Sequence, residues 1–333
     1  MTTHLLIQIG ERVPPSHDDR SWRLRLGLLR RELACLGSVV VAYSGGVDSS
    51  LLLRVAHEVL GGRAHGVIGR SDSYAAGEIG LALDQAAGFG ARVEIVTTGE
   101  LSDPRFRSNP ADRCYHCRGE LYRRLDEVAR RVGAVAVLDG TIADDLTDWR
   151  PGRRAAAEHD VRSPLAELGF SKAEVRAAAA EYGLASHDKP ASPCLASRIP
   201  YGIEITAEKL GMVERGEALL RALGFRELRL RHHGESARIE VPADELRRLV
   251  EPGVRERVVG GLKALGYRFV TLDLEGFRSG SLNAGWIPAA DESRPGEAAP
   301  DLRPGQKTGN RALRGGDITL APHGGGGTER DPR

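Results

Sequence analysis

Short apolar runs alternate with helical patterns between residues 39 and 183, and this alternation is the strongest constraint on the fold. The runs that are typical of buried strands lie at 39–42, 65–68, 92–96 and 135–138. The helical patterns between and after them cover 51–60, 76–87, 119–131 and 171–183. Strands joined by helices of about 10 to 15 residues form right-handed βαβ units. The sequence therefore predicts an α/β fold with a parallel, doubly wound sheet, whose ligands bind at the carboxyl ends of the strands.

The patterns on either side of this region divide the chain further. Residues 1–20 are predicted to be a loose leader, and 21–200 the parallel-sheet domain. From residue 201 a helix is followed by strand patterns at 227–231, 237–241 and 267–272, which predicts a smaller α+β domain over 201–285. The tail, 286–333, contains 9 glycines and 6 prolines. That share exceeds the roughly 25 to 30% typical of low-complexity chain, so the tail is predicted to be disordered.

Charge and cysteine content exclude several classes of protein. Lys and Arg total 47 against 46 Asp and Glu, so the net charge is +1 and no global basic field favours a nucleic-acid partner. No apolar run approaches the roughly 18 residues of a membrane span, and the leader lacks the features of a signal peptide. Four cysteines in 333 residues do not make a disulfide scaffold. We expect a cytoplasmic homo-oligomer whose clustered cysteines bind metal or take part in catalysis.

A phosphate-binding loop follows the first predicted strand. The segment Ser44-Gly45-Gly46-Val47-Asp48-Ser49-Ser50 runs directly into a helical pattern. Adjacent glycines allow a tight turn and a close approach to a ligand, and the start of a helix offers N–H groups and a positive dipole end to an anion. No lysine follows the glycines, so this is not the loop of the Walker type. The segment predicts contacts with a nucleotide from Ser44, Gly45, Gly46, Asp48, Ser49 and Ser50.

This loop resembles the PP-loop of ATP pyrophosphatases, which split ATP between the α- and β-phosphates and adenylate a substrate. Four further segments narrow the resemblance: Asp139 to Asp145, Asp148 to Gly152, Ser163-Pro164-Leu165 and Lys189 to Arg198. Over residues 21–283 the chain is similar to the family of ATP-dependent sulfur transferases that build the nickel-pincer nucleotide cofactor of lactate racemase. The resemblance implies adenylation of the carboxylates of a pyridinium dicarboxylate mononucleotide and their conversion to thiocarboxylates. ATP is the implied cosubstrate and the small nucleotide the implied partner.

Two acids and one arginine extend the predicted nucleotide site. Asp144 and Asp145 follow a predicted strand end, where one or two carboxylates are the usual protein ligands of the Mg²⁺ that accompanies ATP. Acids of this kind also occur simply at the start of a helix. Arg150 lies in a loop and is a candidate contact for phosphate, although a solvated arginine fits the same pattern.

The cysteines bear on the source of sulfur. In one branch of the family the cysteine that matches Cys194 gives up its own sulfur; in another, three cysteines hold a 4Fe-4S cluster. This chain has Cys194 and also the CxxC pair Cys114 and Cys117. Three protein thiolates leave one iron of such a cluster open, and we favour this arrangement. A sacrificial Cys194, a zinc site and a redox pair remain alternatives. Cys35, on an apolar helix stripe, is predicted to be a core residue.

The resemblance also assigns residues around and beyond Cys194. It favours Ser197, Arg198 and Arg229 at the substrate phosphate, where an arginine fork matches phosphate oxygens in pairs, and Glu217 and Glu240 near the transfer site. Solvated charges are the simpler interpretation. The rival functions are a PP-loop tRNA thiolase, which would need a basic surface for RNA, and a non-catalytic sensor of adenine nucleotides.

Overall fold

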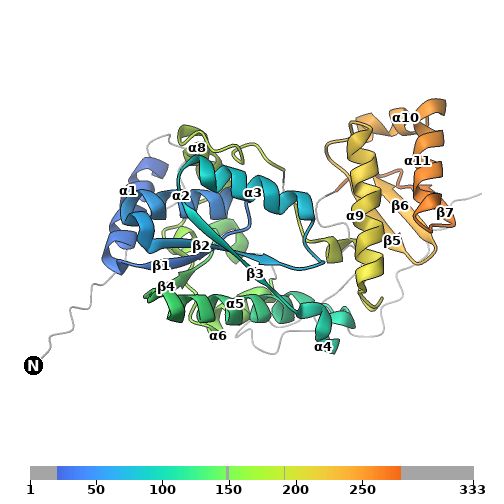
Figure 1. Ribbon diagram of the computed structural model, residues 1–333. Helices are drawn as coiled ribbons and strands as arrows, with labels where there is room; N and C mark the ends of the chain where they lie inside the picture. The colour runs from blue at the N-terminus through green and yellow to red at the C-terminus, as the bar shows by residue number, and fades with distance from the viewer. Residues whose placement is uncertain (1–20, 148–149, 191, 279–333) are drawn as a thin grey trace, which may run out of the picture. The chain divides into compact units, whose positions relative to one another are not determined.

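The computed structural model describes residues 21–147, 150–190 and 192–278, and all of them belong to one compact unit. The predicted leader and tail lie outside the described residues. A parallel sheet with the strand order β3-β2-β1-β4 forms the first half of the unit (Figure 1). Its strands are β1 (Val39–Ala42), β2 (Ala64–Arg70), β3 (Arg92–Thr97) and β4 (Ala136–Leu138). The predicted α/β fold class is therefore confirmed.

Helices cover both faces of this sheet, because its strands carry apolar side chains on both sides. Val39 and Val41 pack in one core with α1 (Ser21–Leu36), α2 (Val47–Leu60), α3 (Ala76–Gly88) and α8 (Lys172–Glu181). Val40 points the other way and packs with α5 (Arg113–Val132) and α6 (Gly152–Glu158). The two short helices α4 (Pro104–Arg107) and α7 (Pro164–Glu167) lie in the connections between these elements. Alternation along one strand thus places helices on both sides of the sheet.

A second sheet has the order β5-β6-β7, with β6 antiparallel to β5 and parallel to β7. Its strands are β5 (Arg229–His233), β6 (Ser236–Glu240) and β7 (Phe269–Leu272). The helices α9 (Ala207–Ala222), α10 (Leu246–Leu249) and α11 (Pro252–Ala264) accompany it. It has its own apolar core, which includes Leu220, Phe225, Leu230, Ile239 and Leu262. The smaller α+β part therefore exists, while a domain boundary at residue 200 stays a prediction.

Two expectations differ from the structure. Helix α5 begins at Arg113 rather than near 119, so Cys114 and Cys117 lie in its first turns. Cys35 is exposed, and its assignment to the core is wrong. The buried stripe of α1 runs through Trp22, Leu26, Leu29 and Leu33, and a residue two positions after Leu33 lies on the opposite side of a helix with 3.6 residues per turn.

Within the described ranges, no helix is both long and apolar enough to cross a membrane.

Candidate active site

The phosphate loop connects β1 to α2 and is shaped by its first glycine. Gly45 has a φ of +71°, and a Cβ atom at this position would lie 2.6 Å from the Cβ of Ala82. Only glycine adopts this left-handed backbone conformation readily and leaves room for so close a contact. Gly46 caps α2 without any side-chain hydrogen bond, so no capping side chain occupies the first N–H groups of that helix. The start of a helix offers N–H groups of this kind to an anion.

The serines of the loop hold its shape. The Ser49 hydroxyl accepts a hydrogen bond from the Ser44 N–H at 3.1 Å and lies 3.1 Å from the Ser44 hydroxyl. Ser50 is fully buried, and its hydroxyl accepts a 2.6 Å hydrogen bond from the Gln85 amide. In this structure the side chains of Ser49 and Ser50 therefore brace the loop and the helix.

A lysine from another helix reaches the loop. The Lys172 ammonium lies 2.7 and 2.6 Å from the two carboxylate oxygens of Asp48, and Lys172 follows the N-cap residue of α8. Burial raises the pKa of Asp48, and the charge of Asp145 adds to this, while Lys172 acts in the opposite direction. Lys172 therefore supplies the cation that the loop sequence lacks. Sequence reasoning identified the capping box Ser171-Lys172-Ala173-Glu174 but not this role.

One predicted magnesium ligand, Asp144, contacts the same lysine, and the charge of the other, Asp145, acts on Asp48. The Lys172 N–H donates to Asp144 Oδ2 at 2.9 Å. Asp145 accepts from the Ile142 N–H at 3.2 Å and forms a 2.8 Å ion pair with Arg150. Mg²⁺ in nucleotide sites needs only one or two carboxylates besides phosphate oxygens, so this donor set suits it in kind.

The end of β4 packs closely against the phosphate loop, and hydrogen bonds to Asp139 hold it in place. A Cβ on Gly140 would lie 2.8 Å from the Ser49 nitrogen, so only glycine allows the two backbones to come this close. The buried carboxylate of Asp139 accepts hydrogen bonds from the hydroxyls of Ser163 at 2.7 Å and Tyr122 at 2.8 Å. Three of the segments that carried the family resemblance, which contain Ser49, Asp139 and Ser163, thus meet at the end of β4.

The three candidate cysteines come from two separate segments. Cys114 and Cys117 lie in α5, and Cys194 precedes a 3-10 turn at Leu195–Arg198. Cys117 and Cys194 pack against the same apolar cluster around Phe106 and Leu195. Cys114 is exposed as a residue, but desolvation of its thiol, followed by the charge of Cys194, raises the pKa of that thiol. Burial also raises the pKa of Cys117 well above its usual value, and Glu100, Cys194 and Cys114 add to it. The three thiols therefore share one electrostatic environment.

The chemistry of these donors suits a metal better than their present arrangement does. Thiolate sulfur is the usual ligand of iron–sulfur clusters. Among the residues that the structure describes, however, no group of three or more His, Cys, Asp or Glu side chains is arranged to hold a metal ion. The residue types thus fit a cluster, and their positions have to adjust to bind one.

Sequence reasoning missed a buried carboxylate beside these cysteines. Glu100 is buried, and its Oε1 accepts a 2.6 Å hydrogen bond from the Ser73 hydroxyl. Its Oε2 is buried and has no hydrogen-bond partner among the described residues. The Ser73 carbonyl in turn accepts the N–H of Leu195 at 2.8 Å, which ties the Cys194 segment to the loop after β2. No local pattern around Glu100 distinguishes it from a surface acid.

Tyr74 connects the phosphate loop to Cys194. Its hydroxyl donates to the Ser44 carbonyl at 2.9 Å. Its side chain also lines a small pocket together with Glu78, Cys194, Arg198 and Glu217. The phosphate loop and the Cys194 segment are therefore neighbours, because Tyr74 bonds to the first and lines a pocket with the second.

Two of the predicted substrate residues form an ion pair with each other. Arg198 and Glu217 are both buried and form a two-pronged ion pair with distances of 2.7 and 3.1 Å. Arg198 also donates to the carbonyls of Pro193 and Cys194 and to the Ser197 hydroxyl. In this structure Arg198 thus holds the Cys194 segment in place.

A second buried pair lies on the small sheet, beside an arginine of a different kind. Glu240 pairs with Arg231 at 2.9 Å through both oxygens, and Arg231 donates to the Ser197 carbonyl. Arg229 forms no ion pair with any described residue, and its guanidinium lies over the ring of Phe277. Burial, together with the charges of Arg198 and Arg231, lowers the pKa of Arg229 to about 10. A half-buried cation without a counter-ion attracts an anion such as phosphate.

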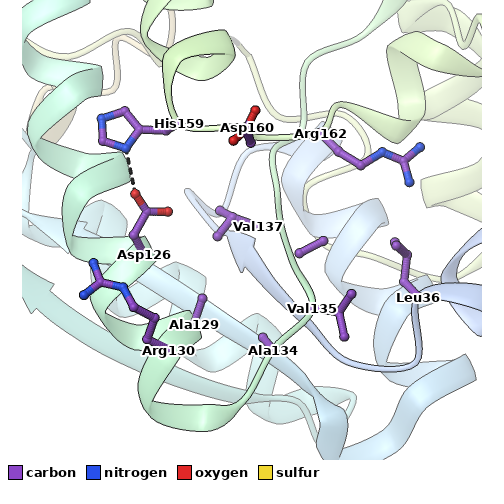
Figure 2. Close-up of a pocket in the computed structure, with 11 residues that line it drawn as sticks. Leu36, Asp126, Ala129, Arg130, Ala134, Val135, Val137, His159, Asp160 and Arg162 are labelled. Atoms are coloured by element: carbon purple, nitrogen blue, oxygen red, sulfur yellow. Dashed lines mark hydrogen bonds and ion pairs between the residues drawn. The ribbon is translucent and has the colours of Figure 1, made fainter.

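Another cavity, of about 430 Å³, lies at the opposite end of the parallel sheet (Figure 2). It is lined by residues from the start of β4, the end of α5 and the segment after α6, and His159 Nδ1 lies 2.7 Å from Asp126 Oδ2 within it. Ligands of open parallel sheets bind at the carboxyl ends of the strands. This cavity is therefore not part of the candidate site.

Comparison with known proteins places the chain among its relatives. No protein-family model matches it. It is 41% identical over 249 residues to the pyridinium-3,5-bisthiocarboxylic acid mononucleotide synthase of Lactiplantibacillus plantarum. This alignment covers 74% of this chain and 90% of that protein. It is 44% identical over 259 residues to an uncharacterised protein of Synechocystis, covering 78% and 97%. A weaker match, 28% over 204 residues, is to the GMP synthase of Aeropyrum pernix, covering 55% and 39%.

Proposed function

Because the chain belongs to the family of the pyridinium-3,5-bisthiocarboxylic acid mononucleotide synthase, we propose that it makes thiocarboxylates from the carboxylates of a pyridinium-3,5-dicarboxylic acid mononucleotide. ATP supplies the activation. The observation that carries the proposal is the adjacency of the phosphate loop and Cys194, which Tyr74 joins through its bond to Ser44 and its place in the Cys194 pocket. An adenylating site and a sulfur source have to be this close for one bound substrate to use both.

The first step is adenylation. A substrate carboxylate oxygen attacks the α-phosphorus of ATP, the bond to the β-phosphate oxygen breaks, and pyrophosphate leaves. The N–H groups at the start of α2 and the ammonium of Lys172 are placed to hold the phosphates, and donors fixed in advance at such points lower the barrier most. When bound, Mg²⁺ would neutralise phosphate charge, and Asp48, Asp144 and Asp145 are its candidate ligands. Arg150, paired with Asp145, is the further candidate for a phosphate contact.

The second step replaces the adenylate by sulfur. A sulfur nucleophile attacks the acyl carbon, and AMP leaves with the electron pair of the broken C–O bond. Activation is needed because a carboxylate by itself offers only oxide as a leaving group. We propose that Cys114, Cys117 and Cys194 hold a 4Fe-4S cluster, supported by their shared environment at α5 and the Cys194 segment. When bound, such a cluster would supply sulfide from the iron that has no protein ligand.

Binding of the substrate is assigned to the small sheet. Arg229 is the arginine available for the nucleotide phosphate, since Arg198 and Arg231 are engaged with Glu217 and Glu240. Ser197 lies beside the small sheet, because Arg231 of β5 donates to the Ser197 carbonyl. We propose that Glu217 and Glu240 act near the transfer site by fixing these arginines. A homo-oligomer in the cytoplasm remains a prediction from the sequence.

Exchange of labelled pyrophosphate into ATP tests the adenylation step. Exchange should require both the protein and the dicarboxylate nucleotide, and Asp48→Ala should abolish it. A nucleotide sensor would show no exchange, and a tRNA thiolase would require tRNA instead of the small substrate. Either result would reject the proposal.

The sulfur source needs a separate experiment on anaerobically purified protein. With a cluster, each of the variants Cys114→Ala, Cys117→Ala and Cys194→Ala should lose both iron and sulfur transfer, whereas Cys35→Ala, on the exposed side of α1, should keep both. If Cys194 is consumed instead, only Cys194→Ala should lose transfer. Turnover would then leave dehydroalanine at that position, about 34 Da lighter by loss of H₂S, as measured by mass spectrometry. That outcome rejects the cluster and leaves adenylation standing, because adenylation depends on the phosphate loop.

A further inference from the structure

Tyr74 occupies a position that the proposed chemistry does not yet use. It lies in the loop between β2 and α3, where its N–H donates to the Ser71 carbonyl at 3.1 Å and closes a turn. Its hydroxyl is committed to the Ser44 carbonyl of the phosphate loop at 2.9 Å. The side chain is half-buried and lines the pocket that contains Cys194. The residue is thus fixed at both its backbone and its hydroxyl.

This fixation decides what Tyr74 offers to a ligand. Because the hydroxyl already donates to Ser44, it is not free to donate to the substrate, and burial raises the pKa of Tyr74 to about 12, so it stays neutral. What remains is the aromatic ring, whose face carries negative electrostatic potential and attracts cations. The charged side chains of the same pocket are already paired: Glu78 with Lys189, and Glu217 with Arg198 and Arg221. The pocket itself has a volume of only about 10 Å³, so a flat cation can meet the half-buried Tyr74 ring only where that ring faces solvent.

The geometry points to Tyr74 as the residue that recognises the positively charged ring of the substrate. We propose that its aromatic face packs against the pyridinium ring and so holds one ring carboxylate between the phosphate loop and Cys194. The inference rests on the proposed function, because the pyridinium substrate comes from it. It adds a determinant of specificity, since an uncharged ring with the same carboxylates gains nothing from this contact.

The test compares two ligands that differ in ring charge. One is the pyridinium-3,5-dicarboxylic acid mononucleotide, and the other is its borohydride-reduced dihydropyridine form, which keeps the ribose phosphate and both carboxylates. Their dissociation constants are measured by calorimetry on the full chain in the presence of a non-hydrolysable ATP analogue. The wild type should prefer the charged ring roughly 5- to 30-fold, the range expected of a partly desolvated cation–aromatic contact.

Three variants give the inference its controls. Tyr74→Phe removes only the hydroxyl and should keep the preference, and Tyr74→Trp should keep or increase it. Tyr74→Leu should bind both forms with similar affinity, and Tyr74→Phe, which also lacks the hydroxyl that contacts Ser44, controls for any change in the phosphate loop. The Trp variant keeps the test decisive if the Leu variant does not fold, because a purely structural tyrosine would not yield a preference that follows the aromatic ring.

Two outcomes overturn the inference in distinguishable ways. If wild type and Tyr74→Leu discriminate between the two forms equally, Tyr74 does not read the ring charge, and the proposed function stands as long as pyrophosphate exchange occurs. If neither form binds and the dicarboxylate supports no exchange in the wild type, the proposed function itself fails and the role of Tyr74 fails with it.

Discussion

Replacing Lys172 by methionine tests the ion pair that α8 supplies to the phosphate loop. The Lys172 ammonium lies within 2.7 Å of both carboxylate oxygens of Asp48. Burial raises the pKa of Asp48, the charge of Asp145 raises it further, and Lys172 opposes both. In the Lys172→Met variant this carboxylate loses its cation and keeps its burial. We therefore expect the variant to be less stable at neutral pH.

The size of the effect follows from the burial of Asp48. Leaving a buried polar group unsatisfied costs about 1 to 3 kcal/mol. The side chain of Asp48 is still 23% exposed, so water compensates in part and we expect about 1 to 2 kcal/mol. For a protein of this size that lowers the melting temperature by roughly 2 to 8 °C.

The pH dependence of this loss has a definite sign. Since the folded-state pKa of Asp48 is raised, its charged form is the one that folding disfavours. The deficit of Lys172→Met is complete above the folded-state pKa that Asp48 has in the variant. It disappears as the pH falls through the folded-state pKa that Asp48 has in the wild type, because below it the carboxyl group is neutral in both proteins. The difference in melting temperature between variant and wild type should therefore shrink as the pH falls from 7 toward 4.

A double-mutant cycle isolates the pair. Thermal unfolding is measured for wild type, Asp48→Asn, Lys172→Met and the double variant, in which neither charge is left alone. The double variant should regain most of the stability that Lys172→Met loses, with a coupling of about 1 kcal/mol. Strictly additive single effects, or a deficit that does not change with pH, would refute the reasoning. In the exchange assay Lys172→Met should lose about 10²- to 10³-fold in rate, as expected for one lost transition-state donor.

Three further predictions concern the loop, the buried pairs and the tail. Gly45→Ala should lose nucleotide binding, measured by calorimetry, and should be less stable, because residue 45 has a φ of +71° and its Cβ would lie 2.6 Å from Ala82. Gly77→Ala is the matched control, since a Cβ at residue 77 meets nothing within 4 Å. Glu217→Gln should lower the free energy of unfolding, measured with denaturant, by about 3 to 5 kcal/mol, since it leaves the buried Arg198 without its carboxylate. The control Glu94→Gln, which breaks the exposed pair with Arg131, should lower it by less than about 1 kcal/mol. Deleting residues 286–333 should leave the melting temperature and exchange rate nearly unchanged, because a segment so rich in Gly and Pro buries too little to offset its ordering entropy; a fall of many degrees would contradict this.

The sequence by itself determined the features that depend on neighbouring residues. Alternation of buried strands and helices predicted the parallel sheet, and the glycines after β1 predicted the phosphate loop. The structure also contains a capping box at Ser171 and Glu174 and a Thr206 cap on α9. Each of these depends on periodicity or on a few adjacent side chains, so it can be recognised without knowing which segments pair.

Only the tertiary structure decided which groups serve the site. Asp48 and Lys172 are 124 residues apart, and they meet because α2 and α8 pack on the same face of the sheet. Tyr74 and Glu100 became site residues because their loops lie beside the phosphate loop and the cysteines. Arg198 is buried beside Glu217 and donates to the Cys194 carbonyl, which only the tertiary structure shows, while its contact with the substrate phosphate stays a prediction. A charge pattern cannot distinguish these roles, because the desolvation of a charge and its partner are both set by contacts between distant segments.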